Sequence, residues 1–371
     1  MKNFFFSFIA ILLVGCQYSP LPESNNLIKI GGIAPLTGDA ASYGTMVQKI
    51  INLRVEQINQ AGGVNGQNIK ILWEDGKCAS GEAVKAAQKL IGVDKVNIIT
   101  GFSCSGSLLA TAPIAEKNKI ILMGSITSSP EVTYSGDFVF RTFPSDASQG
   151  QILGQAAQKK FKRIGMLVEQ SDYAMSIGDV FLKYFQGEII KETFVPSESD
   201  FRTRITKLKN SDIEMLFISP QAPAKFDIIA KQLSEQDWDI PLWGNEMISN
   251  DLEIVSRYED LFQRTKAVSA SFLAPENEQL TTFLRSYREL YREDPKFFNY
   301  VGATIDSLDI LVHAIQKVGN ASDTSAIRDA LYSTQNYNGM LGKFSFDANG
   351  DIDFTHTLLQ FDGEVFSPLE K

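Results

Sequence analysis

The sequence contains little histidine or cysteine: two histidines and three cysteines occur among its 371 residues. The histidines, His313 and His356, lie far apart, and no cysteine or histidine cluster has the spacing of metal ligands. The sequence also lacks a G-x-G-x-x-G segment and a P-loop, which counts against a dinucleotide or ATP as cofactor. We therefore expect neither a metal nor a cofactor.

Blocks of basic residues are absent as well. The formal net charge is −9, and lysines and arginines are scattered among a larger number of acids. Surfaces that bind nucleic acids are strongly basic, so we expect no nucleic-acid partner. The apolar fraction of 44% and the charged fraction of 21% are those of an ordinary globular protein with a large core.

Long hydrophobic runs are absent except at the N-terminus, where residues 4–14 are apolar and follow Lys2. This run is too short to span a bilayer as a mature helix and is typical of a signal peptide. It ends in the sequence LVGC at Cys16, which resembles a bacterial lipoprotein box. We expect residues 1–16 to be a lipoprotein signal peptide that is cleaved before Cys16, whose thiol then carries lipid. An ordinary secretory peptide cleaved nearby is the alternative.

Residues 17–26 (QYSPLPESNN) would then form a flexible tether. These features predict a lipid-anchored protein on the periplasmic or extracellular face of the cell envelope, with the membrane leaflet left open. In such an oxidising compartment, Cys78 and Cys104 remain as an even pair once Cys16 is lipidated. A disulfide between them is favoured, and two free thiols are the alternative.

Short apolar runs alternate with amphipathic stretches along most of the chain, which predicts an α/β fold with doubly wound parallel sheets. A first series of strands and helices runs from Leu27 to about Phe143, and a second series of similar plan follows. The length also favours two lobes. Residues 343–346 and 355–361 are expected to pair as a closing hairpin around the turn at residues 347–351.

Polar side chains follow the predicted strands, where ligands of doubly wound sheets bind. The stretch 97–107 (NIITGFSCSGS) predicts a strand, a polar turn and a helix start, and such a helix N-terminus suits an anionic group. The first series supplies mainly hydroxyl groups at these positions, and the second supplies acids and an aromatic ring. This division suits a zwitterion with a carboxylate and an ammonium group. The alternative is that these residues only cap helices.

A serine hydrolase is a remote alternative. Gly101-Phe102-Ser103-Cys104-Ser105 differs from the G-x-S-x-G nucleophile elbow by its last residue. A hydrolase also needs a histidine, yet His313 falls in a predicted helix and His356 is expected on the polar face or edge of the last strand. We therefore expect no enzyme activity.

The chain resembles the type I periplasmic binding proteins of the leucine/isoleucine/valine-binding family over nearly all of residues 27–371. The resemblance depends on five short motifs taken together. These are residues 33–38 (IAPLTG), 58–66 (INQAGGVNG), 74–78 (EDGKC), 104–105 (CS) and 140–142 (FRT).

The resemblance implies two doubly wound, Rossmann-like lobes that are joined by three crossover segments and close on ligand like a hinge. The crossings would fall near Phe143, Ala270 and Leu341. Lobe 1 would comprise residues 27–143 plus 271–341, and lobe 2 residues 144–270 plus 342–371. A disulfide between Cys78 and Cys104 also follows from the resemblance.

The resemblance further implies a ligand site between the lobes. Ser105 and Ser128 would bind a ligand carboxylate, whereas the Ile126 carbonyl, the Ser128 hydroxyl and Glu246 would hold its ammonium. The side chains of Tyr43 and Tyr173 would wall the pocket from opposite lobes. Gln221 stands where branched-chain binders usually have a tyrosine, and it could serve a ligand with a polar or amide side chain.

The implied function is that of a substrate-binding protein of an ABC importer, which captures a small amino acid, branched-chain or related, and delivers it to a permease. The partners would be the permease and ATPase subunits, and the protein itself would be a monomer. An amide- or urea-binding protein, or a sensory protein of the same fold, is the alternative.

Overall fold

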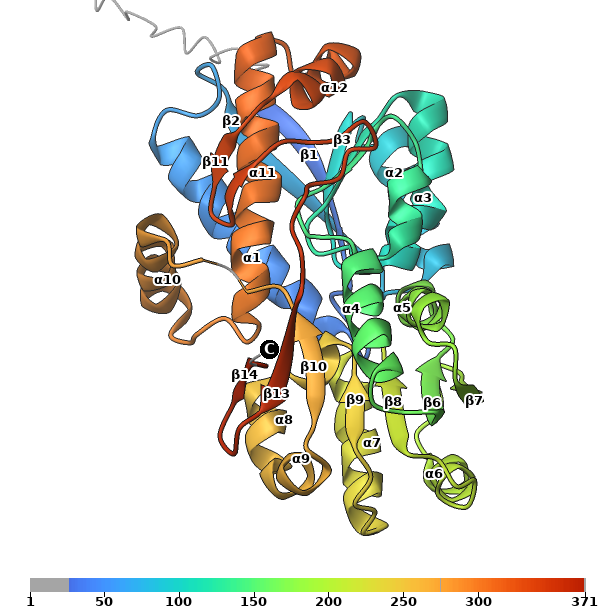
Figure 1. The fold of residues 1–371 in the computed structure, drawn as a ribbon. Helices are drawn as coiled ribbons and strands as arrows, with labels where there is room; N and C mark the ends of the chain where they lie inside the picture. Colours follow the sequence, from blue (N-terminus) through green and yellow to red (C-terminus); the bar gives the residue numbers. More distant parts are fainter. Residues whose placement is uncertain (1–26, 274, 370–371) are drawn as a thin grey trace, which may run out of the picture.

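The computed structural model describes residues 27–273 and 275–369, which fold into two α/β lobes (Figure 1). The expected signal peptide, tether and lipidation site at Cys16 lie outside these residues. None of the described helices is long and apolar enough to cross a membrane. The described residues contain no group of three or more histidine, cysteine, aspartate or glutamate side chains that could hold a metal ion.

Lobe 1 is built on a five-stranded, wholly parallel sheet with the order β2-β1-β3-β4-β5. Its strands are β1 (Leu27–Ala34), β2 (Asn68–Asp75), β3 (Ile98–Phe102), β4 (Ile121–Gly124) and β5 (Val139–Arg141). Its helices are α1 (Ala41–Gln60), α2 (Ser80–Gly92), α3 (Ser105–Asn118), the 3₁₀ helix η1 (Pro130–Tyr134), α10 (Glu278–Tyr291), α11 (Phe298–Val318) and α12 (Thr324–Ser333). A ribbon of β11 (Tyr337–Gly339) and β12 (Gly342–Phe344) packs beside α11.

Helices cover both faces of this sheet, because neighbouring strand residues point to opposite sides. Ile98 packs in the cluster that α1 and α11 contribute to, whereas Ile99 packs with α2 and α3. The same alternation separates Ile121 from Leu122 in β4. The apolar runs read from the sequence are therefore buried on both faces, as in doubly wound sheets.

Lobe 2 is built on a seven-stranded sheet with the order β14-β13-β10-β9-β8-β6-β7. Its strands are β6 (Arg163–Glu169), β7 (Glu188–Phe194), β8 (Met215–Ser219), β9 (Leu242–Gly244), β10 (Val268–Ser271), β13 (Thr357–Phe361) and β14 (Phe366–Pro368). Its helices are α4 (Asp146–Gln158), α5 (Asp172–Tyr184), α6 (Arg202–Lys209), α7 (Pro223–Glu235), the 3₁₀ helix η2 (Glu246–Ile248), α8 (Leu252–Arg257) and α9 (Glu259–Thr265). Five strands are parallel, and β13 and β14 add an antiparallel edge.

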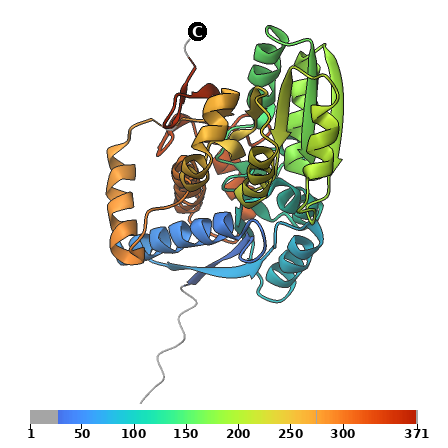
Figure 2. The same ribbon diagram turned by 90° about the horizontal axis from the view of Figure 1, so that it is seen from below.

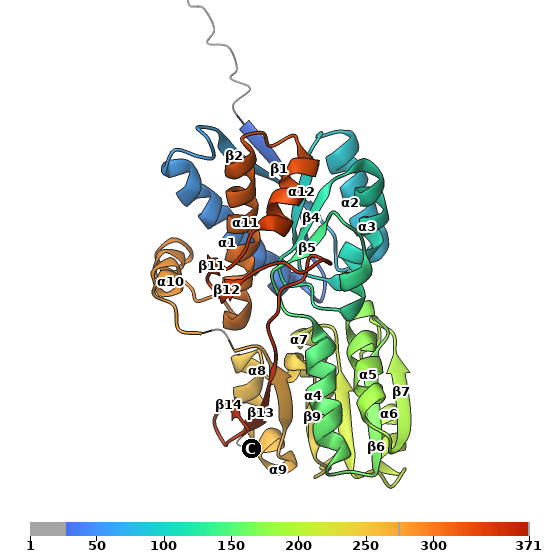
Figure 3. The same ribbon diagram turned by 45° about the horizontal axis from the view of Figure 1, so that its top comes forward.

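The chain crosses between the lobes three times, and Figure 3 shows two lobes end to end with these segments between them. The first crossing joins β5 to α4, and the second follows β10. The third lies later than the position expected at Leu341. The backbone N–H of Arg141 in lobe 1 donates to the carbonyl of Gly350, and Asp351 forms an ion pair with Arg141, whereas β13 pairs with β10 in lobe 2.

The predicted closing hairpin is wrong. β12 pairs with β11 in lobe 1, and β13 pairs with β10 and β14 in lobe 2. Only the bridge between Phe346 and Ile352 turns the chain back around residues 347–351. Phe346 packs against the ring of Phe140 in lobe 1 (centroids 5.1 Å apart), which separates the two predicted partners. Helices α8 and α9 and strands β11 and β14 were not predicted.

The placement of His356 on a polar face or edge is also wrong. His356 precedes β13 and is 5% exposed, with its ring 6.5 Å from that of Phe143 at the first crossing. Its Nδ1 lies 2.6 Å from the Ser148 hydroxyl. Burial lowers the pKa of His356 to about 3, so the ring is neutral and joins the first and third crossings by packing.

Candidate ligand-binding site

The turn between β3 and α3 is fixed to its neighbours by a disulfide. Cys104 is the N-cap residue of α3 and is bonded to Cys78, with the two Cα atoms 5.5 Å apart. The disulfide expected from the resemblance is therefore present, and the alternative of two free thiols is wrong. The bond holds the first turn of α3, and with it Ser105, against the loop that precedes α2.

Ser105 joins this turn to the loop after β4. Its buried hydroxyl accepts hydrogen bonds from the backbone N–H of Ser128 (3.3 Å) and Ser129 (3.2 Å). Arg141 supports the same loop by donating to the Ser129 carbonyl at 2.7 Å. The two serines that the resemblance assigns to the ligand are thus in contact. Ile126 lies in the same loop and its N–H donates to the Phe102 carbonyl at 3.3 Å.

Glu246 supplies a buried carboxylate from lobe 2. It begins η2 directly after β9 and is 1% exposed. Its Oε1 accepts a long hydrogen bond from the Tyr173 hydroxyl (3.5 Å), but its Oε2 has no hydrogen-bond partner within the part of the chain that the structure describes. Burial and repulsion from Asp146 raise its pKa to about 8.

Asp146 is a second buried acid beside Glu246. It begins α4 at the first crossing, and its backbone N–H donates to the Ser128 carbonyl at 2.8 Å. Among the described residues its Oδ2 has no hydrogen-bond partner, and burial raises its pKa to about 7. Two adjacent carboxyl groups with unpartnered oxygens favour a cation between the lobes, because buried negative charge without a partner is costly.

Tyr43 and Tyr173 approach this acid pair from opposite lobes. Tyr43, in α1, donates to Met247 Sδ in lobe 2 at 2.6 Å, and Tyr173 lies in the first turn of α5. The ring of Tyr300, from α11, lies 5.7 Å from that of Tyr43, and its hydroxyl accepts from Asn250 of lobe 2 at 2.8 Å. The lobes therefore touch through side chains that surround Glu246.

The structure thus connects five of the seven predicted ligand residues. We call these five, with Asp146 and Tyr300, the interlobe cluster; its members are Tyr43, Ser105, Ser128, Asp146, Tyr173, Glu246 and Tyr300. Ile126 lies in the same loop as Ser128, but no described contact links its side chain to the members of the cluster. Gln221 is half-buried and its N–H donates to Glu169 at 2.8 Å, and no described contact links its side chain to Glu246.

Sequence reasoning missed Asp146 and Tyr300. Asp146 follows the FRT motif by four positions and could have been found as a polar residue at a predicted crossing. Tyr300 lies in α11, far from every predicted strand end in the sequence, and only the tertiary fold brings it to the acids.

A charged pair also spans the lobes. The Lys225 side chain is 5% exposed, and its Nζ lies 3.4 Å from Asp39 Oδ2 in lobe 1. The same Nζ donates to the Glu198 carbonyl at 2.8 Å. Together with the contact between Tyr43 and Met247, this pair describes a closed arrangement of the lobes.

No described contact supports a serine hydrolase at the β3 turn. The Ser103 hydroxyl donates to the carbonyl of Gly101 at 3.2 Å, which is a local backbone bond. His356 instead contacts Ser148, and His313 is exposed on α11 with its ring 5.7 Å from that of Tyr337. Neither histidine has a described contact with Ser103 or Ser105.

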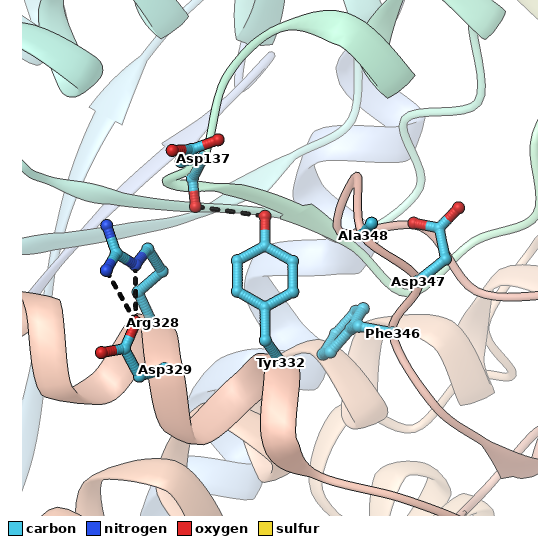
Figure 4. A pocket seen from close by; sticks show the side chains of 7 residues that line it. All are labelled: Asp137, Arg328, Asp329, Tyr332, Phe346, Asp347 and Ala348. Atoms are coloured by element: carbon cyan, nitrogen blue, oxygen red, sulfur yellow. Dashed lines mark hydrogen bonds and ion pairs between the residues drawn. The ribbon is translucent and has the colours of Figure 1, made fainter.

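A surface pocket of about 490 Å³ lies on lobe 1, away from the interlobe cluster (Figure 4). Figure 4 shows Tyr332 donating to the Asp137 carbonyl (3.3 Å) and Arg328 paired with Asp329. Since the one cation of the lining is already paired, and no predicted ligand residue lines the pocket, we do not assign the ligand to it.

Comparisons with known proteins agree with this architecture. The family model described as "Periplasmic binding protein" matches residues 27–363. The leucine-, isoleucine-, valine-, threonine- and alanine-binding protein of Pseudomonas aeruginosa is 27% identical over 361 residues, which cover 94% of this chain and 93% of that protein. The Leu/Ile/Val-binding protein BraC3 of Rhizobium johnstonii is 23% identical over 363 residues, with coverage of 92% and 93%.

Solved structures of substrate-binding proteins also have the same overall fold as this chain. LivJ of Streptococcus pneumoniae, a branched-chain amino acid transporter substrate-binding protein solved with isoleucine, has a TM-score of 0.79 and 27% identity, covering 92% of this chain and 97% of its own. A solute-binding protein of an ABC transporter from Rhodopseudomonas palustris, solved with 3,4-dihydroxybenzoic acid, has a TM-score of 0.80 and 23% identity, with coverage of 92% and 96%. The latter likeness concerns the fold alone.

These relatives are substrate-binding proteins of transporters, not enzymes, and the family is extracytoplasmic. The matched region includes lobe 1, lobe 2 except its edge strand β14, and every residue of the interlobe cluster. The chain therefore belongs to the periplasmic binding protein family, with the two-lobed type I fold of its leucine/isoleucine/valine-binding members.

Proposed function

We propose that this protein captures a small α-amino acid, branched-chain or related, between its lobes and delivers it to the permease of an ABC importer. The observation that carries the proposal is the buried Glu246 carboxylate, whose Oε2 lacks a hydrogen-bond partner among the described residues. A ligand ammonium would supply the missing positive charge and donor. The P. aeruginosa and S. pneumoniae relatives, named for branched-chain amino acids, support this ligand class.

The ligand carboxylate would bind at the start of α3. The Ser128 N–H donates to the Ser105 hydroxyl through a bond of 3.3 Å, which is slightly longer than the usual range for an N–H donor. A carboxylate is a stronger acceptor than a hydroxyl, and the positive end of the α3 dipole favours it. Ligand binding would therefore replace this bond by two bonds to the carboxylate.

The mechanism would be capture by closure. The carboxylate binds lobe 1 and the ammonium binds Glu246 of lobe 2, so the ligand favours the arrangement in which both lobes contact it at once. The shift in the open–closed equilibrium is set by the difference in affinity between the two forms. The ATP hydrolysis that drives import would belong to partner subunits, and the protein would act as a monomer held to the membrane by lipid on Cys16.

A thermal-shift screen of the mature protein against amino acids, amides, urea and benzoates tests the ligand class. A ligand at 100 times its dissociation constant should stabilise the protein by about 2.7 kcal/mol. We expect stabilisation by an α-amino acid. A response to benzoates or amides with none to amino acids would contradict the proposal, since Glu246 would then face a neutral or negative group.

Transport and lipidation need separate measurements. Deletion of the gene should abolish uptake of the radiolabelled amino acid by whole cells, and unchanged uptake with a lost signalling response would favour a sensory protein. Incorporation of radiolabelled fatty acid should require Cys16, and labelling that persists in a Cys16→Ser variant would contradict the lipid anchor.

A further inference from the structure

Exposed lysines without ion-pair partners gather at one edge of the lobe 1 sheet. The strands are parallel, so their N-terminal ends share an edge: Lys29 in β1 lies beside Lys70 in β2. Lys95 and Lys119 precede β3 and β4, which continue the same register. All four side chains are exposed, and none forms an ion pair with any residue in 27–273 or 275–369. We call these four residues the lysine edge.

A pocket of about 390 Å³ opens at this edge. Lys29 and Lys95 line it together with amide and hydroxyl side chains that include Gln67 and Ser322, and its lining contains no carboxylate. Two cations without a paired acid, surrounded by hydrogen-bond donors, suit an anionic group such as a phosphate. This composition contrasts with the chain as a whole, whose formal net charge is −9.

The acids closest in sequence to the lysine edge already have partners. Asp94 forms an ion pair with Lys89 at 3.2 Å. Glu116 accepts a hydrogen bond from the backbone N–H of Phe138 at 2.7 Å. Neither carboxylate forms an ion pair with a lysine of the edge among the described residues.

The position of the edge along the chain indicates what it faces. Leu27, the first described residue, lines the same pocket at the start of β1, the blue strand in Figures 2 and 3, so the sequence before it is attached at this edge. If Cys16 carries lipid, the ten residues 17–26 separate the edge from the bilayer by at most about 35 Å. Val93, an apolar side chain that is 72% exposed, follows α2 at the same edge.

We propose that the lysine edge binds the anionic headgroups of the membrane, with a headgroup phosphate between Lys29 and Lys95. The nearness of this edge to the bilayer depends on the lipid anchor of the proposed function. The clustering of unpaired lysines is independent of that anchor. Because the predicted ligand residues follow the opposite, C-terminal ends of the strands, this docking leaves the interlobe cluster and lobe 2 directed away from the bilayer. The anchored protein would then rest on the membrane with its ligand site open to solvent.

Co-sedimentation with vesicles tests the proposal without the anchor. The mature chain that starts at residue 16, with Cys16→Ser and without the apolar signal peptide, would be mixed with phosphatidylcholine vesicles, with and without phosphatidylglycerol. We expect binding only to the anionic vesicles, with binding that weakens as salt increases. The double variant Lys29→Gln/Lys95→Gln should bind about 25-fold more weakly, since each lysine near an anionic surface contributes about fivefold.

The matched control is Lys183→Gln/Lys231→Gln, which removes two exposed lysines from helices of lobe 2. Equal binding by the two double variants, or no preference for anionic vesicles, would overturn the proposal. Thermal stabilisation of the protein by inorganic phosphate, without any binding to vesicles, would also overturn the proposal, because the pocket would then bind a free anion. If vesicle binding depends on Lys29 and Lys95 but Cys16 takes up no labelled fatty acid, only the lipid anchor would be refuted.

Discussion

Replacement of Glu246 by glutamine should change stability and binding in opposite directions. Burial, with repulsion from Asp146, raises the pKa of Glu246 from 4.5 to about 8. Between these two pH values the folded chain holds a proton that the unfolded chain releases, so the stability contributed by this group falls as pH rises. From pH 4.5 to pH 7, at 1.36 kcal/mol per unit, the loss is about 3 kcal/mol.

Glutamine keeps the shape of the side chain and does not titrate. The ligand-free Glu246→Gln variant should therefore be more stable than the wild type by about 3 kcal/mol at pH 7, and the difference should vanish below pH 4.5. Urea unfolding monitored by circular dichroism at several pH values would measure both quantities. Glu235→Gln is the control, because it removes one negative charge of lobe 2 from a surface pair with Arg202.

The same substitution should weaken amino-acid binding by at least about thirtyfold, since it removes one partner of a buried charge pair. In the wild type, ligand binding should release a proton from Glu246, so affinity should rise with pH up to about 8. Isothermal titration in buffers of different ionisation enthalpy measures the released proton. A variant that binds normally and keeps the wild-type pH dependence would refute the role given to Glu246.

Three further predictions concern the frame around the site. Replacing Cys78 and Cys104 by serine opens a loop with a sequence separation of 26 and should lower the free energy of unfolding by about 3.5 kcal/mol, measured by urea titration; a loss below 1 kcal/mol would contradict it. Asp351→Asn should cost about 3 kcal/mol by the same assay, because it leaves the buried Arg141 guanidinium unpaired, and an unchanged unfolding midpoint would be contrary evidence. Asp39→Asn removes the ion pair that spans the lobes; because Asp39 is exposed, ligand affinity should fall by no more than about fivefold, and a larger loss would mean that the pair does more than favour closure.

Much of the fold could be predicted from local patterns. The strand, polar turn and helix start predicted for residues 97–107 occur as β3 and the first turn of α3, because buried β-branched runs and helix-start signals are local properties. The end of the first series of strands and helices near Phe143 was read from the sequence, whereas the crossing there was expected from the family resemblance. These features require no knowledge of distant contacts.

Strand pairing and buried polar contacts could not be predicted in this way. Residues 343–346 and 355–361 both look like hairpin strands, yet their partners lie in different lobes because Phe346 packs on Phe140. His356 has the sequence context of an exposed strand residue and is buried only because two crossings meet there. Pairing and burial of this kind depend on where distant segments meet.

The candidate site shows the same division. Ser105 and Glu246 follow predicted strands, where ligands of doubly wound sheets bind, and the family resemblance singled them out among the polar residues there. Tyr300 reaches Glu246 from a helix that the sequence places far from both, and Asp146 gains its importance from its closeness to Glu246. The sequence could not predict that Asp146 and Glu246 are both buried, each with one carboxylate oxygen that lacks a hydrogen-bond partner among the described residues.

The most direct test is a crystal structure of the protein loaded with the amino acid that stabilises it most. We expect closed lobes, the ligand ammonium within hydrogen-bond distance of Glu246 Oε2, and the ligand carboxylate at the Ser105 hydroxyl and the Ser128 N–H. A ligand bound between the lobes with its ammonium away from Glu246, or bound outside the interlobe cluster, would contradict this expectation.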